Sequence, residues 1–327
     1  MKSFWFQAQA VGINKQIYDK AFRGISPRAR IIKKSKSQPE FAQSVRDYVN
    51  GRVSSLRIKI GREKARQNSA LLKLLERSYG VDRYTILAIW GMESSYGNDL
   101  KNRKLIGNTI QALATLAYTG GERTLFWEKQ LLAALAILQR GDITPGEMEG
   151  SWAGAMGHTQ FIPTTYEVYA VDHDRDGKRD IWNSIPDALA STANYLNKSG
   201  WVAMKTWGYE AELPAGFNYL LSDKTVIKSL SEWSQIGIGR PGGKSFPRPT
   251  DMAYLLLPAG HKGPAFLMLK NFGVIKRYNN ADAYALAVGH LADRIRGGKP
   301  FNGVWPKDER PLTRSEKKEL QSILISL

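Results

Sequence analysis

The stretch TILAIWGMESSYG (85–97) places one carboxylate, Glu93, at the end of an apolar run and just before two serines and a glycine. The residue pattern around it predicts a helix over 83–95. In such a helix Glu93 follows Ile89 by four residues and Trp90 by three, so the three side chains share one face. We therefore expect Glu93 to lie in an apolar setting and not in open solvent.

Two interpretations of Glu93 follow from this setting. Burial beside apolar side chains disfavours the charged form of a carboxylate and raises its pKa, which a general acid working near neutral pH requires. A carboxylate hydrogen-bonded at a helix end, with a purely structural role, would have the same surroundings. The spacing alone leaves both open.

Composition describes a globular chain of 327 residues, 43% hydrophobic and 24% charged, with room for two or three lobes. The longest apolar run, LLAALAIL (131–138), is too short to cross a bilayer, which takes about 20 residues. Zero cysteines exclude disulfides and thiolate chemistry, and four scattered histidines argue against a His-rich metal site. The net charge of +17 predicts an anionic partner. No zinc-finger spacing or RNP aromatic box is present, so we do not expect nucleic acid.

The remaining pattern is mostly helical. Asp82 is expected to cap the central helix, Pro39 to lie in a first helical turn, and an amphipathic stretch to run to a C-cap at Gly80. Two apolar runs around a Pro/Gly turn over 251–269 predict paired strands. Further helices are predicted over 106–117, 123–140, 185–200 and 280–295. We divide the chain into an N-terminal helical region (1–80), a core (81–200), a small α/β insertion (201–270), a helix returning to the core (271–300) and a tail (301–327).

A glycine-rich loop, AGAMGHTQFIPTTY (153–166), is the second candidate for function. Its small residues allow the backbone to approach a neighbour or a ligand closely, and Gln160 supplies an amide donor and acceptor. A tightly packed turn without a ligand explains the same composition.

An acidic loop follows, DHDRDGKRDIWN (172–183). Asp172, Asp174 and Asp176 fit positions 1, 3 and 5 of an EF-hand-type loop, a glycine fits position 6, and the carbonyl of Lys178 fits position 7. Asn183 occupies position 12 in place of the usual glutamate. The alternative is a solvated acidic turn, in which the alternating aspartates would repel one another. The pattern favours a structural Ca²⁺.

Five segments, AIWGMESSYG, NTIQALATLAY, SWAGAMGHTQFIPTTYEVYAVD, ANYLNKSGW and IKRYNNADAYALAV, occur in this order. Together they resemble the lytic murein transglycosylase B family of the lysozyme-like superfamily, over residues 5–298. The resemblance implies a mainly α (α+β) fold: a lysozyme-like helical core, an N-terminal helical extension and a small β-containing insertion. It also implies cleavage of peptidoglycan between N-acetylmuramic acid and N-acetylglucosamine without water, leaving 1,6-anhydro-muramoyl ends. No cofactor for catalysis is implied.

The resemblance also implies roles for single residues. Glu93 matches the one catalytic acid/base. The matched substrate-binding residues are Ser151 near the acid, Gln160 on the sugar, Tyr195, Tyr278 and Asn279 in the cleft, and Arg123 toward the acidic stem peptide. Taken without the resemblance, a tyrosine at such a position is more often core or interface.

The sequence departs from the family pattern in three places. Glu122 stands where a second arginine is usual beside Arg123, and His158-Thr159 replace an aromatic residue and a glycine, which could reshape the sugar subsite. The acidic loop lacks its closing glutamate, and the family's later closing aspartate matches Asp187, with Asp180 as a second candidate.

Two rival functions remain at this point. A hydrolytic muramidase would need a second carboxylate near Glu93, and a non-catalytic glycan-binding or calcium-stabilised scaffold protein would need no acid at all. The residues able to supply a second carboxylate are Asp99, Glu122, Glu147 and Glu149.

Partner and location are expectations from the resemblance. The partner is the peptidoglycan glycan strand, the location is periplasmic or exported, and a monomer is the simplest expectation for the oligomeric state. The first residues lack the continuous apolar segment of an export signal. The tail PLTRSEKKELQSILISL (311–327) resembles the opening helix of a peptidoglycan-binding module whose remainder is missing, and a plain amphipathic helix explains it equally well.

Overall fold

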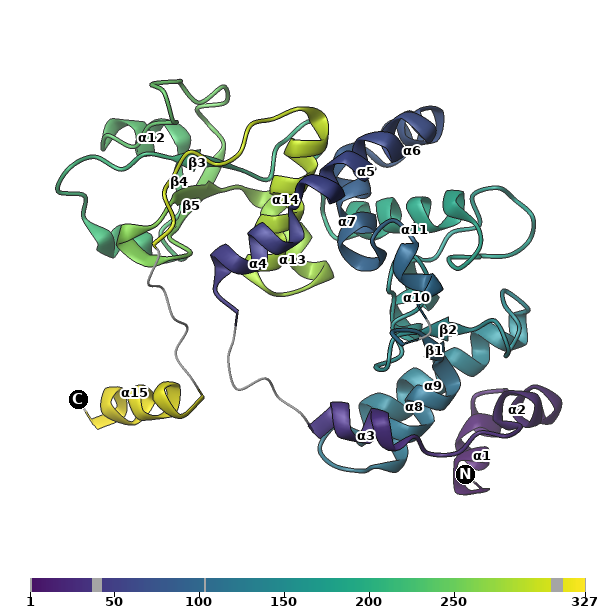
Figure 1. Cartoon of the computed structure of the whole chain (residues 1–327). Coiled ribbons are helices and arrows are strands. Elements are labelled where there is room, and N and C mark those ends of the chain that lie inside the picture. Colours follow the sequence, from purple (N-terminus) through teal and green to yellow (C-terminus); the bar gives the residue numbers. More distant parts are fainter. Residues whose placement is uncertain (1, 37–42, 103, 307–313, 327) are drawn as a thin grey trace. The chain divides into compact units, whose positions relative to one another are not determined.

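The computed structural model describes residues 2–36, 43–102, 104–306 and 314–326. Over these residues the chain is mainly helical and carries a two-stranded and a four-stranded antiparallel sheet (Figure 1). The expected mainly α class with a small sheet late in the chain is confirmed. The chain forms two compact units. Unit 1 comprises Met1–Gln38, Asn68–Leu75 and Ile89–Tyr195, and unit 2 comprises Pro39–Gln67, Glu76–Ala88 and Leu196–Leu327.

Unit 1 is built around helix α9, which packs against α2, α8 and α10 (Figure 1). Its core is made by fully buried aliphatic side chains such as Leu113, Leu135 and Ile137. The helices are α1 (Lys2–Ala10), α2 (Lys15–Phe22), α3 (Ala29–Lys36), α8 (Thr109–Tyr118), α9 (Thr124–Arg140) and α10 (Pro163–Tyr169). Strands β1 (Gly107–Asn108) and β2 (Glu149–Gly150) pair antiparallel beside them. Helices α6 (Ser69–Tyr79), α7 (Arg83–Ser94) and α11 (Ile185–Lys198) each belong partly to unit 1 and partly to unit 2.

Unit 2 combines a helical part and a sheet. Helix α14 (Asp282–Arg296) packs against α4 (Val45–Arg52), α5 (Ser55–Gln67) and α13 (Lys270–Tyr278). The sheet has the order β3-β6-β5-β4 with every pair antiparallel. Its strands are β3 (Gly208–Ala211), β4 (Lys228–Ser229), β5 (Met252–Leu256) and β6 (Ala265–Met268), and helix α12 (Leu230–Gln235) lies against them. Helix α15 (Arg314–Ser326) ends the chain.

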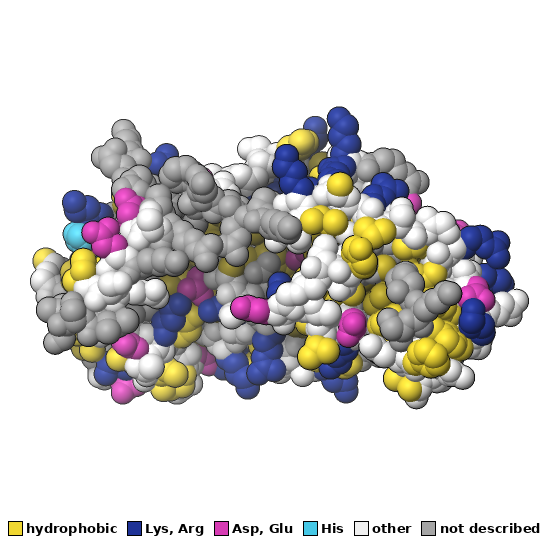
Figure 2. Space-filling view, turned by 90° about the horizontal axis from the view of Figure 1, so that it is seen from below, with side chains coloured by type: hydrophobic (Ala, Val, Ile, Leu, Met, Phe, Trp, Pro, Cys, Tyr) yellow, Lys and Arg dark blue, Asp and Glu magenta, His cyan; other side chains and the backbone are white. Residues whose placement is uncertain are grey.

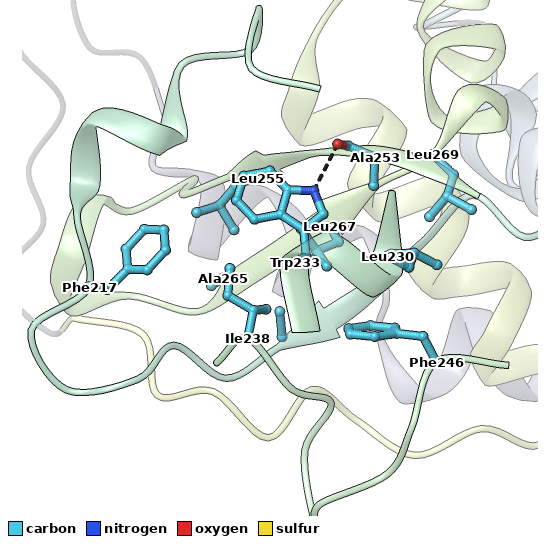
Figure 3. Packing of buried hydrophobic residues seen from close by; sticks show 11 residues of the cluster. Phe217, Leu230, Trp233, Ile238, Phe246, Ala253, Leu255, Ala265, Leu267 and Leu269 are labelled. Carbon is cyan, nitrogen blue, oxygen red and sulfur yellow. Dashed lines mark hydrogen bonds between the residues drawn. The ribbon is translucent and has the colours of Figure 1, made fainter. Parts of the chain in front are cut away.

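The sheet of unit 2 has its own hydrophobic core, centred on Trp233 of α12 (Figure 3). The indole is fully buried and its Nε1–H donates to the carbonyl of Ala253 at 2.9 Å, so the one polar atom of the ring is satisfied. Leu255 and Leu267 of the two central strands pack in the same cluster. A capping box between Ser229 and Glu232 starts α12 at the end of β4.

Several predicted elements are confirmed. The Asp82 carboxylate caps α7 by accepting the N–H groups of Tyr84 and Thr85 at 3.1 and 3.0 Å. Helices α9, α11 and α14 and the strand pair β5–β6 follow the predicted ranges closely. Gly80 and Gly141 end α6 and α9 in the left-handed conformation, with φ of +68° and +83°.

Other elements differ from the prediction. The amphipathic stretch that ends at Gly80 is covered by two helices, α5 and α6, because the helix is interrupted at Asn68. Helix α8 begins at Thr109 and not at 106, since the two preceding residues pair with β2 and the Asn108 side chain accepts the N–H of Gln111 at 2.9 Å. The expected first-turn position of Pro39 falls outside the described residues. Within the described part of the chain, no helix has the length and apolarity needed to cross a membrane.

Candidate active site

Glu93 lies in the last turn of α7 and is half-buried. Ile86 and Ile89 on the same face are fully buried and Trp90 is nearly so. The predicted apolar stripe is therefore confirmed, and the carboxylate sits where this stripe meets the end of the helix.

A strained turn follows Glu93 directly. Ser95, Tyr96 and Gly97 are all left-handed, with φ of +49°, +58° and +88°. Each non-glycine residue in this conformation costs about 1–2 kcal/mol, so neighbouring contacts must hold the turn. Tyr96 supplies two of them: its N–H donates to the Trp90 carbonyl at 3.3 Å, and its buried ring lies edge-on to the indole at 5.6 Å. The turn ends α7 abruptly just after Glu93.

His158 connects this helix end to the glycine-rich loop. The Trp90 indole N–H donates to His158 Nδ1 at 3.0 Å, and the Ser94 hydroxyl donates to the His158 carbonyl at 3.0 Å. Because Nδ1 accepts a hydrogen bond, the ring is neutral with its proton on Nε2. The imidazole also fills the space above Gly97, where an added Cβ would lie 2.4 Å from His158 Cε1. His158, considered from the sequence as a modifier of the sugar subsite, is thus part of the framework behind Glu93.

The glycine-rich loop folds tightly on itself. The Ser151 hydroxyl oxygen accepts the N–H groups of Ala153 and Ala155 at 3.3 and 3.2 Å, which leaves its own proton outside these bonds. Gln160 is left-handed, with φ of +51°, and its amide nitrogen donates to the Gly157 carbonyl at 2.9 Å. The close backbone approach expected of the small residues is real, since a Cβ on Gly157 would lie 2.5 Å from the carbonyl oxygen of Ile181.

A cavity of about 620 Å³ lies beside this loop, entirely within unit 1. Arg123 lines it, with its guanidinium 4.8 Å from the ring centroids of both Phe126 and Trp127. Trp152, which is 36% exposed, forms part of the wall. Stacked guanidinium and exposed aromatic faces suit a ligand with both carboxylate and sugar parts.

Sequence reasoning missed these aromatic residues. Phe126 and Trp127 follow Arg123 by three and four residues at the start of α9, so their helical spacing could have revealed the stack. Trp152 was visible as a large aromatic residue among small ones in the loop.

Basic side chains surround a smaller cavity of about 110 Å³ that Ser151 and Trp152 also line. Its basic lining residues are Arg28, Arg30, Lys34 and Lys104. Figure 2 shows Lys and Arg side chains at several places among hydrophobic and acidic ones. The four basic residues around the small cavity make a local positive charge that suits an acidic ligand.

The remaining predicted substrate residues lie on two helices. Tyr195, near the end of α11, packs against Phe161 and Tyr169 with ring centroids 5.8 and 4.7 Å away. Tyr278 is half-buried at the end of α13, and Asn279 is exposed just after it. Tyr195 belongs to unit 1 with Glu93, whereas Tyr278 and Asn279 belong to unit 2.

The four rival carboxylates differ in how they are held. Asp99 Oδ2 accepts the Ser95 hydroxyl at 2.8 Å, and Glu147 Oε2 accepts the Thr144 hydroxyl at 2.7 Å. Glu122 is exposed and lines the larger cavity of unit 1. Glu149 lies on β2 and is half-buried, as Asp99 is.

The acidic loop brings three of its predicted ligands together. One carboxylate oxygen from each of Asp172, Asp174 and Asp187 lies within 4.8 Å of the others. Asp187 is fully buried at the start of α11, and burial raises its pKa, while backbone N–H groups of His173 and Asp180 act in the opposite direction. Asp172 Oδ1 is buried with no hydrogen-bond partner among the described residues. A hard cation such as Ca²⁺ fits this oxygen cluster and would satisfy that atom.

Other members of the loop shape it without joining the cluster. Gly177, with φ of +90°, makes the sharp turn expected at position 6, and its N–H donates to Asp172 Oδ2 at 3.0 Å. Asp176 accepts the N–H of Lys178 at 2.9 Å. Asp180 accepts the N–H groups of Trp182 and Asn183, both at 2.9 Å, and so caps the next turn; it is not one of the three clustered carboxylates.

The second half of the acidic loop is hydrogen-bonded to the glycine-rich loop and its neighbours. The Trp182 indole N–H donates to the Glu149 carbonyl at 2.8 Å, and the Ile181 carbonyl accepts the N–H of His158 at 2.9 Å. Arg179 donates to the buried Asp142 at 3.1 Å near the end of α9. These hydrogen bonds join the acidic loop to the segment that carries Ser151 and Gln160, so that a rigid acidic loop also stabilises this segment.

Comparison with known proteins agrees with this geometry. Residues 1–293 match the family model described as the transglycosylase SLT domain. The membrane-bound lytic murein transglycosylase B of Escherichia coli K12 is 32% identical over 224 residues, which are 66% of this chain, and the chain spans 58% of that curated relative. The structure of SltB3 from Pseudomonas aeruginosa in complex with NAG-anhNAM-pentapeptide has a TM-score of 0.95 and 50% identity, covering 99% of this chain and 86% of that one. The Escherichia coli lytic transglycosylase Slt35 in complex with calcium has a TM-score of 0.73 and 25% identity, covering 90% and 91%. The chain belongs to the transglycosylase SLT domain family.

Proposed function

We propose that the protein is a peptidoglycan lytic transglycosylase that cleaves between N-acetylmuramic acid and N-acetylglucosamine and leaves 1,6-anhydro-muramoyl ends. The observation that carries this proposal is one half-buried glutamate at the end of a helix whose last turn is held by Trp90, Ser94 and His158, in a unit that also has a cavity lined by aromatic and basic side chains. The 50% identical SltB3, solved with NAG-anhNAM-pentapeptide, supports the same substrate and product. We place the activity in the periplasm, on glycan strands.

Glu93 performs both proton transfers in this proposal. Its protonated carboxyl donates to the glycosidic oxygen as the bond to the muramoyl anomeric carbon breaks. The resulting carboxylate then takes the proton of the muramoyl C6 hydroxyl while that oxygen bonds to the anomeric carbon and closes the anhydro ring. The glutamate ends protonated, as it began, and no water is consumed. Glycosidases usually need two carboxylates, but here the substrate supplies its own nucleophile.

The other candidate residues bind and orient the strand. The Ser151 hydroxyl proton, which its loop bonds leave available, is assigned to the Glu93 carboxyl. Gln160, Tyr195, Tyr278 and Asn279 are assigned to the sugars. Arg123 is assigned to a carboxylate of the stem peptide, because its planar guanidinium is already held by two aromatic rings.

We further propose that Asp172, Asp174 and Asp187 hold a structural Ca²⁺, with the Lys178 carbonyl and Asp176 completing the shell as the EF-hand pattern suggests. The bound ion would offset much of the negative charge of the cluster and cross-link the loop. Slt35, which shares the fold, was solved with calcium. The ion takes no part in the reaction.

The experiment that tests the function compares Glu93→Gln with Glu149→Gln on purified murein sacculi. We expect Glu93→Gln to release anhydro-muramoyl fragments at least about 10²-fold more slowly, as for loss of a general acid. Glu149→Gln, the matched control for a second carboxylate, should keep the wild-type product. Lysis by Glu93→Gln at the parent rate would contradict the assignment of the acid. Loss of activity in both variants would favour a hydrolytic muramidase that uses two carboxylates.

A further inference from the structure

Unit 2 contains a long groove that the proposed reaction does not use. A cavity of about 910 Å³ and another of about 450 Å³ share five lining residues, Thr206, Trp207, Tyr209, Asp293 and Arg296, so they adjoin one another. We call the two cavities together the unit 2 groove. Glu93 is not among the lining residues of either cavity.

The acidic side chains of the groove are already satisfied by the protein. Asp82 pairs with Arg296 at 2.6 Å, and Asp293 Oδ2 accepts the Trp207 indole N–H at 3.0 Å. Glu210 accepts the backbone N–H groups of Asn302 and Gly303 at 2.7 and 2.6 Å. These carboxylates are therefore already bound by donors of the protein itself.

Five basic side chains of the groove are in the opposite situation. They line it and form no ion pair within the part of the chain that the structure describes: Arg77, Arg240, Arg248, Lys244 and Lys299. Because the acids are engaged and these cations are not, the groove has an unbalanced positive lining that suits an anionic ligand.

Met204 and Tyr209 supply an apolar part of the groove lining. Met204 is 86% exposed and left-handed, with φ of +61°, an unusual state for a methionine. The fully buried Asn271 fixes its loop: Oδ1 accepts the N–H of Val202 at 2.8 Å, and Nδ2 donates to the carbonyls of Val202 and Lys205 at 2.9 and 2.8 Å. Half-buried Tyr209 adds an aromatic face, stacked with Arg240 at 5.0 Å. The strained, clamped loop indicates a built surface.

We propose that the unit 2 groove binds carboxylate-bearing stem peptides of a murein strand, outside the active site. This inference rests on the proposed function for the identity of the strand. Arg77 and Arg248 bind the peptide carboxylates through charge-assisted hydrogen bonds, and Met204 with Tyr209 contacts the aliphatic and sugar parts beside them. A second contact on the same strand raises the local substrate concentration at the catalytic unit.

The test measures co-sedimentation with insoluble sacculi in the Glu93→Gln background, so the result does not depend on whether Glu93 is the catalytic acid. The groove variant carries Arg77→Glu and Arg248→Glu. Its matched control carries Lys262→Glu and Lys270→Glu, which make the same charge change at exposed positions of unit 2 outside the groove. Circular dichroism first establishes that both variants are folded.

We expect the groove variant to bind sacculi about tenfold more weakly than the control, since each reversal removes a charged hydrogen bond. On soluble glycan strands freed of their peptides by an amidase, with binding followed by isothermal titration calorimetry, the two variants should bind equally. Equal binding of both variants to intact sacculi would overturn the proposal, because the groove would then contribute nothing beyond overall charge. Unequal binding to the peptide-free strands would also overturn it, since the groove would then bind glycan and not peptide.

Discussion

The turn that follows Glu93, and the contact of His158 with that turn, fix the end of the helix that carries the carboxylate. The last turn of α7 is followed by three left-handed residues, and His158 lies over the third of them, Gly97. An accurate position matters for a single carboxylate that must reach first one oxygen of the substrate and then another.

Gly97→Ala tests this framework. The alanine would adopt an unfavourable φ of +88° and its Cβ would meet the His158 ring at 2.4 Å. We expect a loss of about 2–4 kcal/mol in the free energy of unfolding, from the sum of backbone strain and overpacking, measured by urea denaturation.

Gly24→Ala is the control for that substitution. Gly24 has a similar φ of +72°, but nothing lies within 4 Å of its Cβ position. Gly24→Ala should lower the free energy of unfolding only by the cost of the backbone strain, about 1–2 kcal/mol. Equal losses at both glycines would show that the contact of His158 with Gly97 is unimportant.

At this scale the sequence predicts burial well and exact geometry poorly. The stripe of Ile89 and Trp90 beside Glu93 follows from helical spacing alone. The left-handed Ser95 and Tyr96 do not, because these residues rarely adopt that conformation and only the surrounding contacts impose it. The role of His158 depends on a hydrogen bond to Trp90, 68 residues away in the chain.

At the scale of elements, the acidic loop supports the glycine-rich loop. The segment over 179–182 joins Asp142, Glu149 and His158 through hydrogen bonds. An ion bound among Asp172, Asp174 and Asp187 would therefore stabilise the surroundings of the candidate acid without touching substrate.

Calcium removal gives the prediction for this element. We expect added Ca²⁺ to raise the Tm of the protein and EDTA to lower it, because the ion binds the folded loop and not the unfolded chain. Asp172→Asn should abolish most of the Ca²⁺-dependent rise, since its buried Oδ1 is a predicted ligand. Differential scanning calorimetry with and without Ca²⁺ measures the Tm of the parent and of the variant.

Asp176→Asn serves as the comparison in the same loop. Asp176 lies outside the three-carboxylate cluster, so this variant should keep more of the Ca²⁺ response than Asp172→Asn. A response that survives in Asp172→Asn, or that is lost equally in both variants, would contradict the cluster as the centre of the site.

The sequence predicts this loop because EF-hand ligands are local and regularly spaced. It could not separate Asp180 from the ligands, since a carboxylate that caps the following turn has the same spacing. The break between α5 and α6 was missed because the residues before Asn68 are mostly good helix formers and no glycine or proline marks the stop.

At the scale of the whole molecule, stability should depend on pH through His290. This side chain is buried on α14, stacks on Phe301 with ring centroids 3.7 Å apart, and has its pKa lowered to about 3 by burial and by the nearby Arg294. The unfolded chain therefore binds a proton at a higher pH than the folded chain does. Stability from this group is complete above its ordinary pKa and is lost as pH falls.

Between pH 7 and pH 5 this histidine should cost the folded state about 2 kcal/mol. His290→Gln, which does not titrate, should lose less stability over the same interval than the parent, whatever its stability at pH 7. Urea denaturation at both pH values measures the two differences. An identical loss in both proteins would show that other groups account for the pH dependence.

At this scale residue patterns predict the fold class, whereas the assignment of residues to the site depends on the family resemblance. The mainly helical class and the late sheet follow from residue patterns. Assigning Tyr278 and Asn279 to the site rests on the resemblance, because they belong to unit 2 while Glu93 belongs to unit 1. No periodicity in a sequence encodes which residues of two units act on one ligand. The basic composition predicted an anionic partner, but only the fold distinguishes paired cations from the five that line the unit 2 groove without an ion pair among the described residues.

The most direct test of the central claim is mass spectrometry of murein fragments released in water enriched in heavy oxygen. If Glu93 directs the C6 hydroxyl onto the anomeric carbon, the muramoyl ends will be 1,6-anhydro and will carry no heavy oxygen. Reducing muramoyl ends that contain one heavy oxygen atom would show that water is the nucleophile and would contradict the account.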